Sequence, residues 1–186
     1  APAPGRGDVG GAMGRDSLYI ACDPGKTGAF IAIDEQARHA WTLPADGPDG
    51  YYLGDHPAVA VLCDALSEHK GNVARLVIEA PLCLRMSGTA TALKVGTGWG
   101  ALRAAIVLAG LPIEVVAPAT WSTWALGKPP AGGWGAKAAK KKRAIEVCRD
   151  RLPSVPLVIA GRRTPSDGIA EAALMALWAL RTSRVV

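Results

Sequence analysis

The chain has 186 residues, of which 49% are hydrophobic, enough for one domain with a sizeable buried core. No apolar run approaches the roughly 18 residues that a membrane-spanning helix needs, so we expect no membrane partner. The four cysteines (Cys22, Cys63, Cys83 and Cys148) are far apart and form no CxxC pair. They indicate small core residues in a reducing intracellular compartment, although the sequence leaves disulfides open.

The formal net charge of +5 is unevenly distributed along the chain. Between residues 126 and 163, ten basic residues stand against two acidic ones, a net +8, which leaves −3 for the remainder. This asymmetry favours an acidic centre combined with a basic surface for a polyanion. A solvated helix face is the alternative for any single lysine in this segment.

Residues 1–16 contain much glycine and proline and almost no large apolar residues. This composition predicts a disordered leader, either a linker or a trimmed targeting segment such as a chloroplast transit segment. We therefore expect the folded domain to span residues 17–186.

Residues 19–34, YIACDPGKTGAFIAID, predict two strands joined by a turn that contains Pro24, Gly25 and Gly28. Asp23 ends the first strand, where an ionised carboxylate next to a buried apolar run needs a cation or hydrogen bonds. The alternative is that Asp23 only initiates the turn. A third strand at residues 38–43 would make this part of the sheet antiparallel.

A helix at residues 57–69 is predicted by apolar residues at helical spacing and by Gly71 just beyond its end. The strand that follows, RLVIE at residues 75–79, ends in Glu79 just before Pro81. A strand, a crossover helix and a second strand imply parallel pairing. Asp23 and Glu79 would then lie at the same edge of the sheet, where open α/β sheets place their sites.

The remaining elements complete an α/β fold with a mixed five-stranded sheet flanked by helices. We interpret residues 82–98 as a small, polar, irregular stretch and residues 99–110 as a helix that Gly110 ends. A strand at 112–117, a short helix at 118–126 and a basic helix at 136–152 follow.

The final helix, predicted to start at residues 164–167 and continue to residue 180, brings two more acids. Asp167 and Glu171 are four residues apart, so they share one helix face. Capping is a good alternative for Asp167 and a weaker one for Glu171. With no His/Cys set to compete, these four carboxylates favour Mg²⁺ or Mn²⁺. Two such ions roughly 4 Å apart can activate a water and stabilise the leaving oxygen of a phosphodiester.

Several motifs now resemble the RuvC-like Holliday junction resolvases of the RNase H-like superfamily. They are the D-P-G turn at residues 23–25, I-E at 78–79, SGTATALKVGTGWG at 87–100 and SDGIAEAAL at 166–174. They occur in the family's order, and the resemblance covers residues 18–182. Bacterial members usually space the last two acids by three residues, whereas Asp167 and Glu171 are four apart. The glutamate at the last acidic position, Glu171, and the Gly/Trp-rich residues 96–100 are closer to the phage or chloroplast branch.

The resemblance implies an RNase H-like fold and a homodimer that nicks four-way DNA junctions symmetrically. It also implies that Asp23, Glu79, Asp167 and Glu171 are the catalytic acids and hold two Mg²⁺ ions, with Mn²⁺ as a substitute. One alternative is an RNase H-like nuclease for RNA/DNA hybrids or single strands. The other is a non-catalytic nucleic-acid-binding module, which would gain nothing from acids facing phosphate.

Seven basic residues are candidates for contacting DNA. Five of them lie within seven residues of the basic helix, enough to neutralise several phosphates: Lys137, Lys140, Lys141, Lys142 and Arg143. Lys26 and Lys94 are candidates for contacting the scissile phosphate.

The helix at residues 99–110 carries Leu102, Ile106 and Leu108 together with several alanines. This is more apolar surface than one sheet face readily covers, so this helix or the segment with Trp121 and Trp124 is predicted to form a two-fold interface. Full burial of the helix against the protein's own sheet is the alternative.

Overall fold

The computed structural model describes residues 17–24, 28–37, 39–43, 56–81, 88–128, 137–158 and 163–183. The predicted leader, Lys26 and Cys83 lie outside these residues. The elements in chain order are β1 (Leu18–Cys22), β2 (Phe30–Ile33), β3 (Ala40–Leu43), α1 (His56–Glu68), β4 (Val73–Glu79), α2 (Thr89–Leu108), β5 (Glu114–Val116), α3 (Pro118–Leu126), α4 (Lys137–Arg151) and α5 (Asp167–Ser183).

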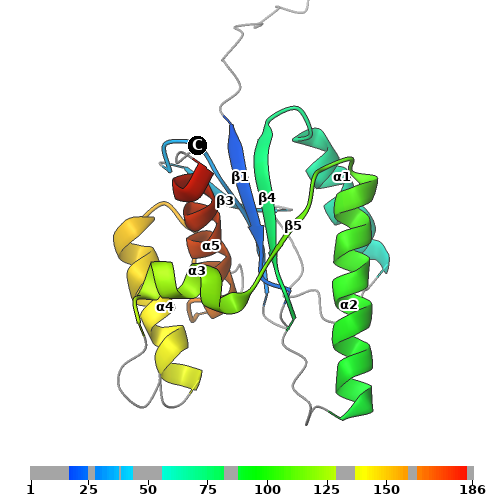
Figure 1. The fold of residues 1–186 in the computed structure, drawn as a ribbon. Helices are drawn as coiled ribbons and strands as arrows, with labels where there is room; N and C mark the ends of the chain where they lie inside the picture. Colours follow the sequence, from blue (N-terminus) through cyan, green and yellow to red (C-terminus); the bar gives the residue numbers. More distant parts are fainter. Residues whose placement is uncertain are drawn as a thin grey trace, which may run out of the picture.

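The strands form one mixed sheet in the order β3-β2-β1-β4-β5 (Figure 1). β2 pairs antiparallel with both β1 and β3, as the turn-rich connections predict. β4 pairs parallel with β1 and with β5, because each of these connections contains a crossover helix. The predicted mixed α/β architecture is therefore confirmed, and β1 and β4 run side by side in the same direction.

Helices cover both faces of the sheet (Figure 1). Alternate residues of β1 point to opposite faces: Ala21 packs in the core under α3, α4 and α5, whereas Ile20 and Cys22 pack in the core under α1 and α2. The four consecutive buried residues of β2 alternate in the same way. A strand buried on both faces has the continuous apolar sequence that identified β1 and β4.

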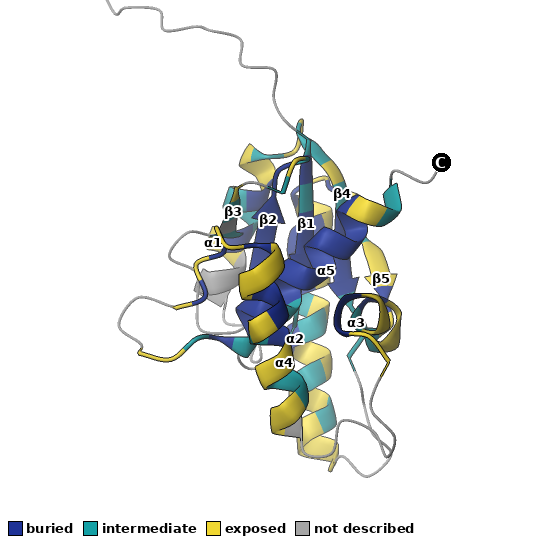
Figure 2. Cartoon of the chain, turned by 90° about the vertical axis from the view of Figure 1, so that its left-hand side faces the viewer, coloured by how far each residue is buried: buried dark blue, intermediate teal, exposed yellow. Residues whose placement is uncertain are grey.

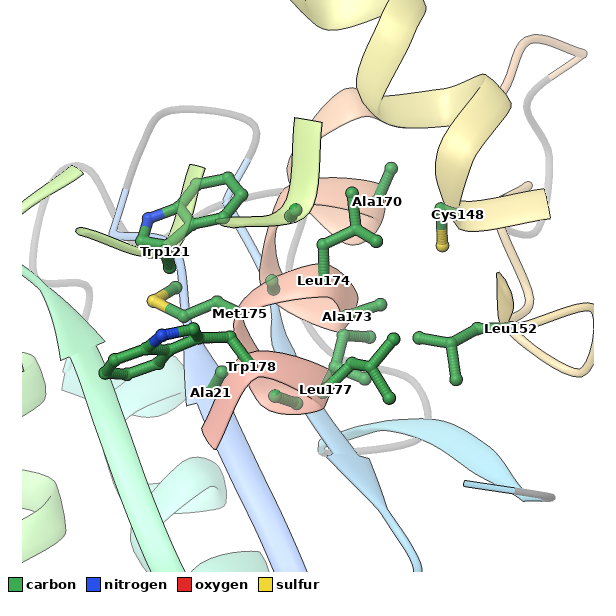
Figure 3. Close-up of a cluster of buried hydrophobic side chains, with 14 of the residues drawn as sticks. Ala21, Trp121, Cys148, Leu152, Ala170, Ala173, Leu174, Met175, Leu177 and Trp178 are labelled. Atoms are coloured by element: carbon green, nitrogen blue, oxygen red, sulfur yellow. The ribbon is translucent and has the colours of Figure 1, made fainter. Parts of the chain in front are cut away.

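Helix α5 is the most deeply buried helix in the described part of the chain (Figure 2). From Gly168 to Leu180 every residue except Glu171 is buried. Figure 3 shows Leu174, Met175 and Trp178 of α5 among side chains from β1, α3 and α4. An apolar helix of this kind packs on several sides at once, so Glu171, the acid among these buried residues, lies in a low-dielectric setting.

Arg75 of β4 fixes the far end of α5. Its guanidinium makes two 2.8 Å hydrogen bonds to the carboxylate of Glu114 on β5 and donates a 3.0 Å hydrogen bond to the carbonyl of Ala179. It also lies 4.9 Å from the centroid of the Trp178 ring. Bidentate pairs of this kind are geometrically specific, so Glu114 fixes the orientation of the guanidinium. The contacts of the guanidinium with Ala179 and Trp178 then hold α5 against the parallel half of the sheet.

Helix α2 begins at Thr89, so the prediction that residues 82–98 are irregular is wrong for residues 89–98. The amides of Thr91 and Ala92 donate to the carbonyl of Gly88, which starts the helix. Each glycine in a helix costs only about 1 kcal/mol, and the packed second half of α2 lets the helix continue through Gly96 and Gly100. No helix in the described ranges is long and apolar enough to span a membrane.

Candidate functional site

The register of β1 and β4 places Asp23 beside Glu79. Cys22 is the partner of Ile78 in the parallel ladder, so the next residue of each strand is an acid, and neighbouring strands are about 4.8 Å apart. Ala21 and Val77 face the core under α5, and strand side chains alternate. Asp23 and Glu79, two residues further on, are therefore directed to the face that α5 covers.

The start of α5 reaches the same edge. The hydroxyl of Ser166 accepts a 3.4 Å hydrogen bond from the amide of Ile169, so Ser166 is the N-cap and Asp167 is the first helical residue. Glu171 follows one turn later on the same helix face. Capping by Ser166 leaves the carboxylate of Asp167 directed to other partners.

The electrostatics show that the carboxylates lie within reach of one another. The pKa of Glu171 is raised to about 7, mainly by burial and also by the charges of Asp23 and Asp167, against the opposing effect of Lys140 and Lys141. Burial also raises the pKa of Glu79, with a smaller increase from Glu171. The sequence prediction that two strand ends and a helix start bring four acids together is therefore supported by their mutual charge effects.

Two lysines of α4 neutralise part of this acidic cluster. Lys141 forms an ion pair with Asp167 through Nζ and Oδ2, and this hydrogen bond is the main reason why the pKa of Lys141 is raised. Lys140 Nζ lies 3.8 Å from Glu171 Oε1. Lys140 and Lys141, which were both predicted to contact DNA, are therefore paired with acids of the site when no DNA is bound.

Trp121 of α3 is a site residue that the sequence reasoning did not assign to the acids. Its indole Nε1–H donates a 2.6 Å hydrogen bond to Oε2 of Glu79, which lowers the pKa of Glu79 against the effect of burial. Lys140 Nζ lies 5.4 Å from the centroid of its ring. A buried tryptophan needs a partner for its N–H, but the acceptor depends on how α3 docks on the sheet, which the sequence alone does not show.

The other predicted DNA-contacting residues lie farther from the acids or outside the described side chains. Lys94 is exposed on the first turns of α2, and Lys142 and Arg143 are exposed on α4. Figure 1 shows the first turns of α2 and α4 extending past the lower edge of the sheet, where β1 and β4 end. Lys137 begins α4, but its side chain is not among those described, and Lys26 lies outside the described residues.

The carboxylates suit a hard divalent cation by their chemistry, because Mg²⁺ and Mn²⁺ prefer oxygen ligands. Within the described residues, however, no three acidic, histidine or cysteine side chains are arranged to hold a metal ion. The ammonium groups of Lys140 and Lys141 occupy part of the space around Glu171 and Asp167. Binding a divalent cation would therefore require these lysines to move away from the acids.

Known proteins resemble this chain in structure rather than in sequence. No family model and no curated protein matches the sequence. The structure of T. thermophilus RuvC in complex with a Holliday junction substrate matches with a TM-score of 0.52 and 20% identity, over 91% of this chain and 96% of that chain. The chain has a RuvC-like fold. A second Thermus thermophilus RuvC structure matches with a TM-score of 0.50 and 22% identity, over 89% and 96% of the two chains.

The likeness to RuvC confirms the resemblance drawn from the ordered motifs at the level of the fold. It extends over 96% of each RuvC chain. The assignment to a phage or chloroplast branch stays a prediction.

Proposed function

We propose that this protein is a metal-dependent, structure-selective endonuclease that resolves four-way DNA junctions by paired symmetric nicks. The observation that carries the proposal is the convergence of Asp23, Glu79 and Glu171 at the edge of a RuvC-like sheet, with Asp167 beside them. Clustered carboxylates that raise one another's pKa are costly for a fold and are typical of functional sites. A module that only bound DNA would repel phosphate with them.

Asp23, Glu79, Asp167 and Glu171 would hold two Mg²⁺ ions, for which Mn²⁺ would substitute. When bound, such ions activate a water and stabilise the leaving oxygen of the phosphodiester. The protein's own side chains orient this chemistry: Trp121 holds one oxygen of Glu79, and Ser166 caps the helix that presents Asp167 and Glu171. Lys140 and Lys141, once released from the acids, would be free to contact phosphate.

The exposed basic residues of α2 and α4 support a DNA substrate. Lys142 and Arg143 are exposed on α4, and Lys94 is exposed on α2, so cations extend from two helices that flank the edge carrying the acids (Figure 1). Each phosphate neutralised by a lysine or arginine releases counterions and adds affinity at low salt. T. thermophilus RuvC is recorded with a Holliday junction substrate, and we extend that substrate class to this chain.

A homodimer would place two such sites on opposed strands. Leu102 and Ile106 of α2 are buried in the protein's own core, whereas Val107 and Leu108 are 61% and 76% exposed. The alternative of full burial therefore holds for one face of α2 and not for the other. We propose that the exposed face forms part of the two-fold interface.

The function is tested by incubating the protein with matched substrates: a four-way junction, an RNA/DNA hybrid, linear duplex DNA and single-stranded DNA. We expect Mg²⁺-dependent conversion of the junction into paired nicked duplexes, and no cleavage when EDTA is present. Preferential cleavage of the hybrid or the single strand would instead identify another RNase H-like nuclease. Junction binding with no cleavage of any substrate in Mg²⁺ or Mn²⁺ would identify a binding module.

A further inference from the structure

We propose that Trp121 is a positioning residue for Glu79: its indole N–H holds one carboxylate oxygen and leaves the other to meet a divalent cation. The inference rests on the proposed function, because it assigns Glu79 to a metal site. Glu79 Oε2 accepts the 2.6 Å hydrogen bond from Trp121 Nε1. The bond joins residues that are 42 positions apart in the chain, so the tertiary fold creates it.

The donor is rigid because the indole has no room to turn. Trp121 is 1% exposed and is among the largest fully buried side chains of the described residues. Figure 3 shows its ring next to Met175 of α5, with Trp178 on the other side of that methionine. A hydrogen-bond donor fixed by packing on several elements determines where its acceptor oxygen lies.

The hydrogen bond restricts how Glu79 can bind a cation. A free glutamate side chain rotates about its Cγ–Cδ bond and can present either or both oxygens. With Oε2 held by Trp121, rotation of the carboxylate is restricted, and we assign cation binding to Oε1. Glu79 is therefore prepared to bind through one oxygen, which lowers the ordering cost when a metal arrives.

The face of the same ring also contacts the lysine beside Glu171. Lys140 Nζ lies 5.4 Å from the ring centroid and 3.8 Å from Glu171 Oε1, a cation–π geometry. Trp121 thus links Glu79 through its edge and Glu171 through its face and Lys140. Phenylalanine at this position would keep a ring face and lose the N–H donor, which separates the two contacts.

The competing explanation is that Trp121 is only a core residue whose N–H has found an acceptor. Trp178 provides a matched control, because it lies in the same core, is 8% exposed and packs against Arg75 instead of an acid of the site. Trp178→Phe removes the same number of atoms from the same core. A purely structural contribution would therefore give Trp121→Phe and Trp178→Phe similar effects on metal binding.

The first measurement uses the intact ring. In ¹H–¹⁵N spectra of the full chain, the Nε1–H signal of Trp121, assigned by its loss in Trp121→Phe, should move in Glu79→Gln and on titration with Mg²⁺. The Trp178 signal should stay in place. A Trp121 signal that responds to neither change would overturn the proposal, and both responses are measured on protein that keeps the Trp121 ring.

The second measurement is Mn²⁺ binding to the free protein, followed by the electron paramagnetic resonance signal of the unbound ion. Loss of a residue that orients a metal ligand typically weakens metal binding about 10-fold or more. We expect that loss in Trp121→Phe and wild-type binding in Trp178→Phe. Equal binding by the wild type and Trp121→Phe would leave Trp121 as a packing residue only.

Cleavage separates this inference from the proposed function. If the junction is cut, Trp121→Phe should lower kcat and raise the Mg²⁺ concentration for half-maximal rate, with KM for the junction unchanged. If no DNA is cut but Mn²⁺ binding still depends on Trp121, the nuclease proposal fails and the positioning proposal stands. If the junction is cut with the same Mg²⁺ dependence in Trp121→Phe, only the positioning proposal fails.

Discussion

Lys141 of α4 forms an ion pair with Asp167, the residue that opens α5. The partner of this cation is one of the four acids proposed to hold metal. An ammonium group and a divalent cation repel each other when both lie beside one carboxylate, so the two compete for Asp167. The ion pair also compensates a carboxylate that lies near Glu171 and Asp23, which stabilises the protein when no divalent cation is present.

The competition predicts that Lys141→Ala strengthens Mn²⁺ binding to the free protein several-fold, because it removes a competitor and leaves Asp167 more available. Lys142→Ala is the matched control, since the neighbouring lysine is exposed on the same helix. Mn²⁺ titrations of both variants in the absence of DNA provide the measurement. Identical Mn²⁺ affinities in the two variants would show that Lys141 does not compete for the site.

Removing a carboxylate at the strand end should separate cleavage from binding. We expect Asp23→Asn to abolish cleavage and to leave junction binding intact or tighter, because the change removes a metal ligand and a negative charge near phosphate. Asp64→Asn, on the exposed side of α1, is the control and should do neither. Gel-shift and cleavage assays on one junction suffice. Parallel loss of binding and cleavage would mean that Asp23 supports the fold or the surface instead.

The exposed end of the basic run should set the salt dependence of DNA binding. Lys142 and Arg143 are exposed, so changing both to alanine should weaken binding to every DNA form. The slope of log K against log salt should become shallower by about 1 to 2. Lys70→Ala, an exposed lysine that precedes β4 at the opposite edge of the sheet, should leave the slope unchanged. An unchanged slope in the double variant would show that α4 does not contact the DNA backbone.

The sequence predicted the sheet and its acidic edge well because both depend on local patterns. The apolar runs that precede Asp23 and Glu79 are bounded by proline and glycine, and a crossover helix between them leaves parallel pairing as the simplest connection. Asp167 and Glu171 share a face through helix geometry alone. The two strand ends and the helix start that carry the acids can therefore each be predicted from their own local sequence.

The contacts that shift the pKa values of the acids and orient their carboxylates could not be predicted from the sequence. Trp121 and Glu79 are 42 residues apart, and Lys141 and Asp167 are 26 apart. Both contacts depend on how α3 and α4 dock on α5, and no local pattern encodes that docking. The start of α2 was missed for the opposite reason: Gly96 and Gly98 are a local signal against helix, and the packing of Leu102 and Ile106 on the sheet outweighs it.

The raised pKa of Glu171 predicts a pH-dependent stability. Its folded pKa of about 7 lies above its ordinary value of 4.5, so folding favours the protonated form. The stabilisation is complete below about pH 4.5 and is lost as the pH rises towards 7, by about 1.4 kcal/mol per pH unit at most. Glu171→Gln cannot ionise and should lack this component. Urea unfolding with EDTA should therefore show the wild type losing stability relative to Glu171→Gln between pH 5 and 7.5; parallel curves would contradict it.

The exposed face of α2 makes the dimer testable without unfolding the protein. Leu108 is 76% exposed, so Leu108→Asp should leave the monomer's melting temperature nearly unchanged while weakening a two-fold interface on this face. Ile106→Asp cannot make this distinction, because Ile106 is buried in the protein's own core and an uncompensated buried charge destabilises any arrangement. Sedimentation across protein concentration should show a dimer for the wild type and a monomer for Leu108→Asp.

The same variant links the dimer to the cleavage pattern. On a supercoiled cruciform, two sites held together should make paired nicks within one binding event, whereas Leu108→Asp should make single nicks that accumulate as open circles. Lys70→Ala again serves as the surface control and should cut like the wild type. A wild-type protein that stays monomeric on DNA and still makes paired symmetric nicks would exclude the dimer. If Leu108→Asp remains dimeric, the interface does not lie on this face of α2, and the partly exposed Trp124 on α3 becomes the next candidate.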